Sequence, residues 1–152
     1  GMSFIDMAYL KKSDLKNGTI TYRRRKTGQQ LTVKWEKCME DIIAKYRENT
    51  ATRYLLSIIT NPCSDERTQY RNAICRINVA LKEVVGLAGL KIPLTMHVAR
   101  HCWASVAKSK NIPLSVISEG MGHDSEETTR IYLASLDTSV VDKANSLILK
   151  DF

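Results

Sequence analysis

An amphipathic stretch over residues 66–86 constrains the fold of this chain more than any other feature. The stretch contains no proline, and its branched apolar side chains recur every three or four residues, the spacing of one helix face. These side chains are Ile74, Ile77, Leu81 and Val84. Pro62 lies shortly before the stretch, and Gly86 and Gly89 end it. We therefore expect a long helix with one apolar stripe over residues 66–86.

Patterns on both sides of this helix predict the rest of the fold. Alternating apolar residues over 19–35, with Gly28 at the turn, predict a β-hairpin. Residues 53–59 form a short apolar segment that fits a helix or a strand. Further helices are predicted at residues 36–48, 96–109, 113–120, 124–133 and 139–149. The 152 residues suit one domain, so we expect a mainly α domain with a small antiparallel β-sheet (α+β) over residues 1–152.

Two helices carry predictable caps. Thr95 suits the N-cap of the 96–109 helix, and Asp124 and Glu127 have the spacing of a capping box for the helix that follows. The apolar residues of the 96–109 helix predict its buried face. They are Ala99, Cys102, Trp103 and Val106.

Composition excludes several classes of protein. With 43% hydrophobic and 26% charged residues, the chain can bury a core and is not a disordered tail. Its apolar runs are too short for a transmembrane helix, and its first residues lack the features of a secretory signal. The four cysteines form no CxxC pair, which indicates reduced thiols in an intracellular protein and not a disulfide framework or a zinc ribbon.

The net charge of +7 is unevenly distributed. Residues 1–60 carry 12 basic and 6 acidic side chains, residues 61–118 carry 8 and 3, and residues 119–152 carry 3 and 7. A basic body with an acidic end is typical of a protein that binds nucleic acid, but many basic domains bind no specific partner. Charge alone leaves both interpretations open.

The 96–109 helix carries the first residues able to do chemistry. His97 and Arg100 lie about 60° apart around the helix axis, opposite the predicted buried face, where they could hold a phosphate near the helix N-terminus. An isolated pair of this kind is more often a solvated surface pair. His97 and His101 also have the spacing of metal ligands, but no carboxylate accompanies them, so a structural, hydrogen-bonded His101 is favoured.

A second group of residues follows about twenty positions later. His123 lies where a loop enters a helix, and Tyr132 follows nine residues on. On one straight helix the two would lie roughly 13 Å apart along the axis. They can share a site only if the helix bends or starts late, or if the tyrosine comes from another subunit.

In combination these residues form a specific pattern: HxxRH at residues 97–101, GH at residues 122–123 and a tyrosine at position 132. The pattern and its spacing resemble the tyrosine recombinases, or phage-type integrases. The resemblance covers residues 2–149 and matches the catalytic domain alone, so we expect a C-terminal fragment of a longer integrase without its N-terminal DNA-clamping domain. The segment Phe4–Leu10 is most similar to integrases of Bacteroides-type mobile elements.

The resemblance implies DNA strand cleavage and rejoining through a 3′-phosphotyrosine intermediate, with no metal, cofactor or ATP. Tyr132 would be the nucleophile, and Arg100 and His123 would bind the phosphate. His97 would orient the phosphate or assist deprotonation of the tyrosine, and Lys26, in the hairpin turn, would protonate the leaving 5′-oxygen. The residues expected to contact DNA are Arg23, Arg24, Arg25 and Thr95. The three arginines alternate along a strand, so only one or two of them can face the DNA.

One position departs from the family pattern. The family has an arginine three residues before the acidic residue of its first box. Asp6 matches the acidic residue, which places Ser3 at the position of the arginine. Either this branch has replaced the arginine or one upstream of the fragment serves, so the fragment as given lacks one phosphate-binding arginine.

The resemblance also implies partners and a location. The expected partner is double-stranded DNA, bound by a homotetramer in the bacterial cytoplasm, at the nucleoid. The apolar stripe over residues 139–150 either packs on its own domain or docks on a neighbouring subunit. Three alternatives to an integrase or transposase stay open: a catalytically lapsed DNA-binding module, a type IB topoisomerase, and a metal-dependent nuclease that uses the three histidines. The DNA target cannot be read from the sequence.

Overall fold

The computed structural model describes residues 1–46 and 50–134. In chain order its elements are α1 (Phe4–Ala8), a 3₁₀ turn η1 (Lys12–Asp14), β1 (Leu15–Lys16), β2 (Thr19–Arg23), β3 (Gln30–Lys34), α2 (Lys37–Ala44), α3 (Glu66–Leu87), α4 (Met96–Ser109), α5 (Leu114–Met121) and α6 (Glu126–Ala134). This is the mainly α fold with one small antiparallel sheet that the sequence predicts. The helix predicted at 139–149 lies outside the described residues.

The N-terminal part of the chain is built around the sheet. β1, β2 and β3 pair antiparallel in sequence order, and Tyr22 of β2 lies opposite Leu31 of β3. Both side chains are buried together with Ile20 and Leu10. Gly28 closes the hairpin at a φ of +73°, a value that glycine adopts without strain. The predicted 19–35 hairpin is thus confirmed, whereas the two-residue β1 is too short to leave a pattern in the sequence.

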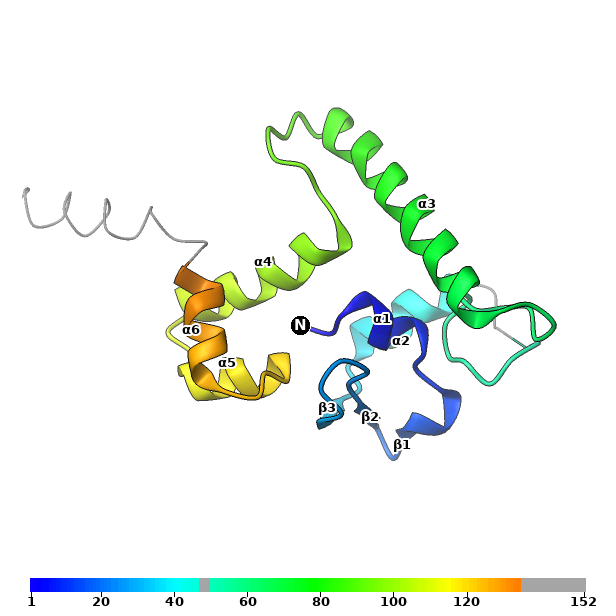
Figure 1. The fold of residues 1–152 in the computed structure, drawn as a ribbon, viewed down its shortest axis with the longest axis horizontal. Coiled ribbons are helices and arrows are strands. Elements are labelled where there is room, and N and C mark those ends of the chain that lie inside the picture. The colour runs from blue at the N-terminus through cyan, green and yellow to red at the C-terminus, as the bar shows by residue number, and fades with distance from the viewer. Residues whose placement is uncertain (47–49, 135–152) are drawn as a thin grey trace, which may run out of the picture.

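The three short helices α4, α5 and α6 gather on the other side of the molecule, and the N-terminus lies between the two groups of elements (Figure 1). Their contacts bury a second core, which consists of Ala104, Ile117, Met121 and Leu133. The turn between α5 and α6 faces the sheet, because the side chain of Arg24 at the end of the hairpin reaches the carbonyl of Gly122. This contact joins the two parts of the fold.

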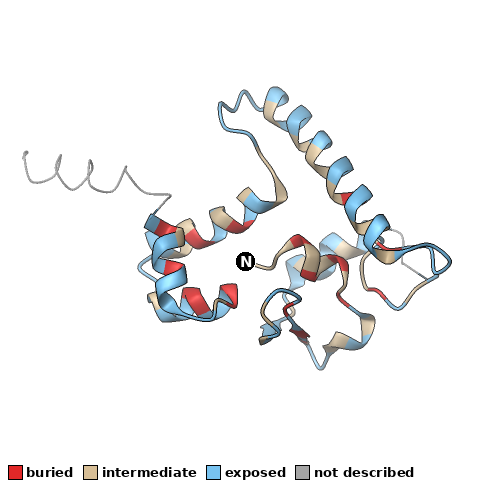
Figure 2. Ribbon diagram, in the orientation of Figure 1, coloured by how far each residue is buried: buried red, intermediate tan, exposed pale blue. Residues whose placement is uncertain are grey.

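The predicted long helix is present as α3, but it is more exposed than its stripe suggests. Ala73 is the one buried residue of α3, and Val84 in the stripe is 46% exposed. Figure 2 shows α3 pale blue and tan over nearly its whole length. The periodicity therefore predicts the helix correctly and overstates how much of it the described part of the chain covers.

The buried face predicted for α4 is wrong. Cys102, Trp103 and Val106 are exposed, and the buried residues are Arg100 and Ala104. The small Ala104 packs closely against α5 and α6, while Trp103 stays 40% exposed with its ring against Gly120 of α5. Consequently Arg100 points into the molecule and not away from its core.

Two smaller predictions also need correction. Residues 53–59 form neither a helix nor a strand, since Tyr54 makes only an isolated bridge to Lys11. At α6 the capping hydroxyl is that of Ser125, which accepts from the backbone N–H of Thr128, so the cap is one residue later than the predicted Asp124. In the described part of the chain, no helix has the length and apolarity needed to cross a membrane.

Candidate active site

Arg100 is the centre of the candidate site. Its side chain is only 6% exposed, because Ala104 one turn later anchors this face of α4 in the core. One terminal nitrogen, Nη2, donates to the carbonyl of Met121 at 2.5 Å and lies 3.3 Å from Nε2 of His123. The other, Nη1, donates to the carbonyl of Gly1. The guanidinium is thus held between α4 and the turn that follows α5.

His123 is positioned by that same turn. α5 ends at Gly122, whose left-handed φ of +61° reverses the chain and turns the following residue toward Arg100. Nδ1 of His123 lies 2.8 Å from the hydroxyl of the buried Thr129, which fixes the ring and leaves Nε2 facing the arginine. Burial, followed by the positive charges of Arg100, Arg24 and Lys26, lowers the pKa of His123. The imidazole is therefore neutral near pH 7 and can hydrogen bond to an oxyanion when its Nε2 carries the proton.

Tyr132 joins the site from α6. Because α6 begins only at Glu126, the chain between His123 and the helix turns back, and the two rings lie 5.5 Å apart. Of the three ways in which these residues could share a site, the structure shows the late start of the helix. Tyr132 therefore lies beside His123 of the same chain. Burial raises the pKa of Tyr132, while the charge of Arg100 and a hydrogen bond from it act in the opposite direction.

The other two histidines flank the tyrosine. The ring of His101 stacks on the ring of Tyr132, and His97 meets His101 edge-on at 4.4 Å between centroids. His97 is exposed and lies 6.3 Å from the tyrosine ring. Among the described residues, no group of three histidine, cysteine, aspartate or glutamate side chains is arranged to hold a metal ion. The rings of His97 and His101 supply aromatic contacts around the phenol of Tyr132.

The hairpin brings positive charge to the site. Arg24 is buried and donates from Nη1 to the carbonyl of Gly122, so it points toward Arg100 and His123. Lys26 is exposed in the turn, and it acts on the pKa of His123, which places its charge near the site.

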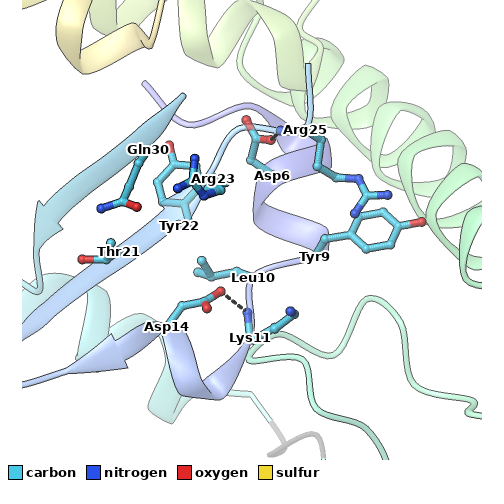
Figure 3. A pocket seen from close by; sticks show the side chains of 10 residues that line it. All are labelled: Asp6, Tyr9, Leu10, Lys11, Asp14, Thr21, Tyr22, Arg23, Arg25 and Gln30. Atoms are coloured by element: carbon cyan, nitrogen blue, oxygen red, sulfur yellow. Dashed lines mark hydrogen bonds between the residues drawn. The ribbon is translucent and has the colours of Figure 1, made fainter. Parts of the chain in front are cut away.

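The neighbouring arginines face elsewhere: Arg23 is the last residue of β2, and Arg25 lies in the turn that follows. Arg23 and Arg25 line a polar pocket on the other side of the hairpin (Figure 3). The guanidinium carbon of Arg25 lies 3.8 Å from the ring centroid of Tyr9, and Arg23 donates to the carbonyl of Gly28. Of the three arginines, only Arg24 reaches the cluster of Arg100, His123 and Tyr132.

The remaining predicted residues have local partners. The hydroxyl of Thr95 accepts from the N–H of Val98 and caps α4, as predicted. Ser3 caps α1, and its hydroxyl donates to Oδ2 of Asp6 at 2.5 Å. A serine carries no charge, so position 3 contributes no cation to the site.

Two residues that support the site were not predicted to do so. Asp6 accepts from the backbone N–H of Arg25 at 2.8 Å, and its Oδ2 lies 3.6 Å from Nε of Arg24. Thr129 holds His123, as described above. The pairing of Asp6 could have been anticipated from the sequence, because an acidic residue is an obvious partner for a hairpin rich in arginine. Thr129 has none, because its partner lies six residues away across an irregular turn.

Comparison with known proteins concerns the family and the fold of the chain. The profile of the phage integrase family matches residues 3–139. The fold is similar to the crystal structure of XerA recombinase, with a TM-score of 0.63 and 21% identity over 95% of this chain and 52% of that one. It is also similar to XerH site-specific recombinase bound to a palindromic difH substrate in a post-cleavage complex (TM-score 0.61, 20% identity, 93% of this chain and 40% of that one).

A third similar structure is the catalytic domain of bacteriophage HP1 integrase, with a TM-score of 0.51 and 21% identity over 95% of this chain and 73% of that one. The chain thus spans about half the length of XerA and less of XerH. Among curated proteins, none matches the sequence. At identities near 20%, these structures establish the fold of the chain and do not establish its reaction.

Proposed function

Because the chain belongs to the phage integrase family, we propose that it acts in site-specific DNA recombination and carries the machinery for cleaving and rejoining DNA strands. The observation that carries the proposal is the convergence of Arg100, His123 and Tyr132. The three residues come from α4, the α5–α6 turn and α6. Together they provide a nucleophile beside groups that bind an oxyanion.

In the proposed reaction, Tyr132 attacks a phosphodiester of duplex DNA. Its oxygen loses a proton and forms a bond to phosphorus, while the bond from phosphorus to the 5′-oxygen breaks. Lys26 gives a proton to that oxygen, so that the strand leaves as a 5′-hydroxyl. The 3′-phosphotyrosine keeps the energy of the broken bond. The 5′-hydroxyl of another strand can therefore attack it, release the tyrosine and reseal the DNA without ATP or a cofactor.

The donors and the burial of Arg100 support the role proposed for it in binding the phosphate. Arg100 carries a fork of donors suited to the nonbridging oxygens of a phosphate, and it is already in contact with His123. Burial strengthens these interactions, because few waters compete for the developing negative charge. His97 is exposed 6.3 Å from the ring of Tyr132, and in the proposed reaction it orients the phosphate or assists loss of the phenol proton.

A second candidate is a DNA-binding module that has lost its catalytic activity. Ser3 favours it, since α1 carries no arginine where the family has one. Both candidates predict salt-dependent binding to duplex DNA by a chain of net charge +7, so binding alone does not separate them.

The separating experiment is replacement of the nucleophile. The chain is incubated with a pool of nicked duplexes that contain a randomised core, and the product is resolved under denaturing conditions. We expect a covalent protein–DNA adduct for the unchanged chain and for Tyr46→Phe, a control tyrosine that is 70% exposed just after α2. Tyr132→Phe should form none. An adduct that persists in Tyr132→Phe, or no adduct from any variant, contradicts the proposed chemistry.

A further inference from the structure

We propose that Arg24 supplies the second guanidinium that binds the scissile phosphate, in place of an arginine at position 3. This inference rests on the proposed function and adds a residue to its site. The second guanidinium group would then come from Arg24 in the hairpin and not from position 3. The chain then needs no additional arginine upstream of Ser3.

Backbone geometry places the two guanidinium groups side by side. Arg100 donates to the carbonyl of Met121, and Arg24 donates to the carbonyl of Gly122, the next residue. The two arginines approach this short segment from different elements, α4 and the hairpin. A phosphate next to Arg100 and His123 therefore also lies within reach of Arg24.

Gly122 shows how closely Arg24 is packed against the segment. A Cβ at position 122 would overlap Cδ of Arg24 and lie 3.0 Å from Leu31. Only a glycine lets the arginine side chain pass over the backbone at this point. The stem of Arg24 is therefore held in one place, and its head group is directed at the site.

The balance of buried charge calls for an anion. Arg24 is 7% exposed and Arg100 6% exposed, and the buried carboxylate that faces them is Asp6, at 4%. Two buried guanidinium groups against one carboxylate leave an excess positive charge, and such an arrangement is unfavourable unless an anion binds. Burial, and after it the charge of Arg24, lowers the pKa of Arg100, which agrees with mutual repulsion between the two guanidinium groups.

Arg24 also keeps donor capacity that the protein does not use. Its Nε is buried and has no hydrogen-bond partner among the described residues, since Oδ2 of Asp6 lies 3.6 Å away. An arginine that served only as a structural link would be expected to satisfy this donor. The carboxylate of Asp6 instead orients the side chain while it binds Ser3 and the N–H of Arg25.

The first test measures anion binding without DNA. Inorganic phosphate is titrated into the chain, and the increase in melting temperature is recorded for wild type, Arg24→Gln and the control Arg23→Gln. Arg23 is exposed and donates to the carbonyl of Gly28, away from Arg100 and His123, so its replacement should leave the increase unchanged. We expect Arg24→Gln to lose most of the increase. An unchanged increase in Arg24→Gln overturns the proposal. If Arg24→Gln does not fold, Arg24→Lys replaces it. The lysine keeps the charge beside Asp6 but lacks the planar fork of donors, so we expect a smaller increase than in wild type, and an unchanged increase overturns the proposal.

The second test identifies the oxygen that Arg24 contacts. DNA recovered as covalent adduct from the randomised pool is resynthesised with a methylphosphonate at the scissile position, where a neutral methyl replaces one charged oxygen. On ordinary DNA we expect Arg24→Ala to reduce adduct formation by about 100-fold, the effect of removing one oxyanion donor. On one methylphosphonate diastereomer the ratio of Arg24→Ala to wild type should rise by about 10-fold or more, because the missing charge needs no partner.

The outcomes separate this inference from the proposed function. An equal defect of Arg24→Ala on both methylphosphonates and on ordinary DNA shows a structural role and overturns the inference, while the adduct itself supports the function. If wild type forms no adduct, the proposed function fails, and the phosphate titration alone decides whether Arg24 binds an anion.

Discussion

The imidazole of His101 lies parallel to the phenol of Tyr132, with ring centroids 4.2 Å apart and an angle of 3° between the planes. His97 packs edge-on against His101 and closes the other side of this stack. Two helices, α4 and α6, therefore fix the plane of the nucleophile through ring contacts. The stack gives His101 a structural role, as expected, but the expected hydrogen bond is not seen, because its buried Nδ1 has no hydrogen-bond partner among the described residues.

Removing this stack should weaken the fold locally. We expect His101→Ala to lower the free energy of unfolding by about 1 kcal/mol, the usual contribution of an aromatic pair. Urea denaturation measures the effect. Cys102→Ala is the matched control, because Cys102 follows on the same helix and is exposed, so it should change stability by less than about 0.5 kcal/mol. Equal values for the two variants would mean that the stack contributes nothing.

Acid should destabilise the protein through two histidines. Burial, then the charges of His97 and Arg100, lowers the pKa of His101, and burial with the cations around it lowers the pKa of His123. Below a pH of about 6.5 the unfolded chain therefore binds more protons than the folded one. The stabilisation is complete above that pH and is lost as pH falls through the folded pKa values.

Unfolding at stepped pH values checks this prediction. The double variant His101→Gln/His123→Gln should lose less stability between about pH 7 and pH 5 than wild type. Identical pH profiles would contradict the assignment to the histidines.

Asp6 should be the carboxylate on which the hairpin depends most. It pairs with Arg24 and accepts hydrogen bonds from Ser3 and from the N–H of Arg25, all in a site where it is 4% exposed. Removal of one partner from a buried ion pair costs about 3 kcal/mol. We expect Asp6→Ala to approach this value by chemical denaturation, and the exposed Asp41→Ala on α2 to stay below about 1 kcal/mol. Similar losses would show that Arg24 tolerates the absence of its carboxylate.

Two glycines with similar backbones should respond differently to alanine. Gly28 and Gly122 have φ values of +73° and +61°, so both variants carry the cost of a left-handed alanine, about 1 kcal/mol. At Gly28 the added methyl meets open space, whereas at Gly122 it meets the side chains of Arg24 and Leu31. We expect Gly122→Ala to cost about 1–3 kcal/mol more than Gly28→Ala in melting or urea experiments. Equal costs would show that Arg24 moves aside freely.

The role proposed for Lys26 can be tested with a better leaving group. In DNA whose scissile 5′-oxygen is replaced by sulfur, the leaving thiolate needs no proton. On ordinary DNA, Lys26→Ala should slow adduct formation by about 100-fold, and on the sulfur-containing DNA it should approach the wild-type rate. Lys37→Ala, an exposed lysine paired only within α2, is the control. A defect that persists with sulfur would exclude Lys26 as the general acid.

Local sequence signals predict most of this architecture. The alternation around Gly28 predicts the hairpin, the uninterrupted amphipathic pattern predicts α3, and the N-cap at Thr95 fixes the start of α4. These features depend on neighbours within a few residues, so a single sequence contains them.

The orientation of α4 could not be predicted in the same way. Apolar periodicity favours burial of Trp103, but the helix buries Ala104 and Arg100, because α5 and α6 require a small residue at the contact. Likewise, nothing local indicates that Arg24, and not Arg23 or Arg25, turns toward the site. That choice depends on Asp6 and Gly122, which lie far from the arginine in sequence.

The hydrogen bond from Arg24 to Gly122 joins residues 98 positions apart and therefore closes a very long loop. Contacts of such high sequence separation form late in folding, because chain entropy opposes them until the intervening segments are in place. Helices α4 to α6 can gather Arg100, His123 and Tyr132 from a stretch of fewer residues, well before the hairpin docks. A partly unfolded chain whose hairpin has undocked would thus hold its nucleophile without the Arg24 and Lys26 charges, so the ability to break DNA depends on the finished fold.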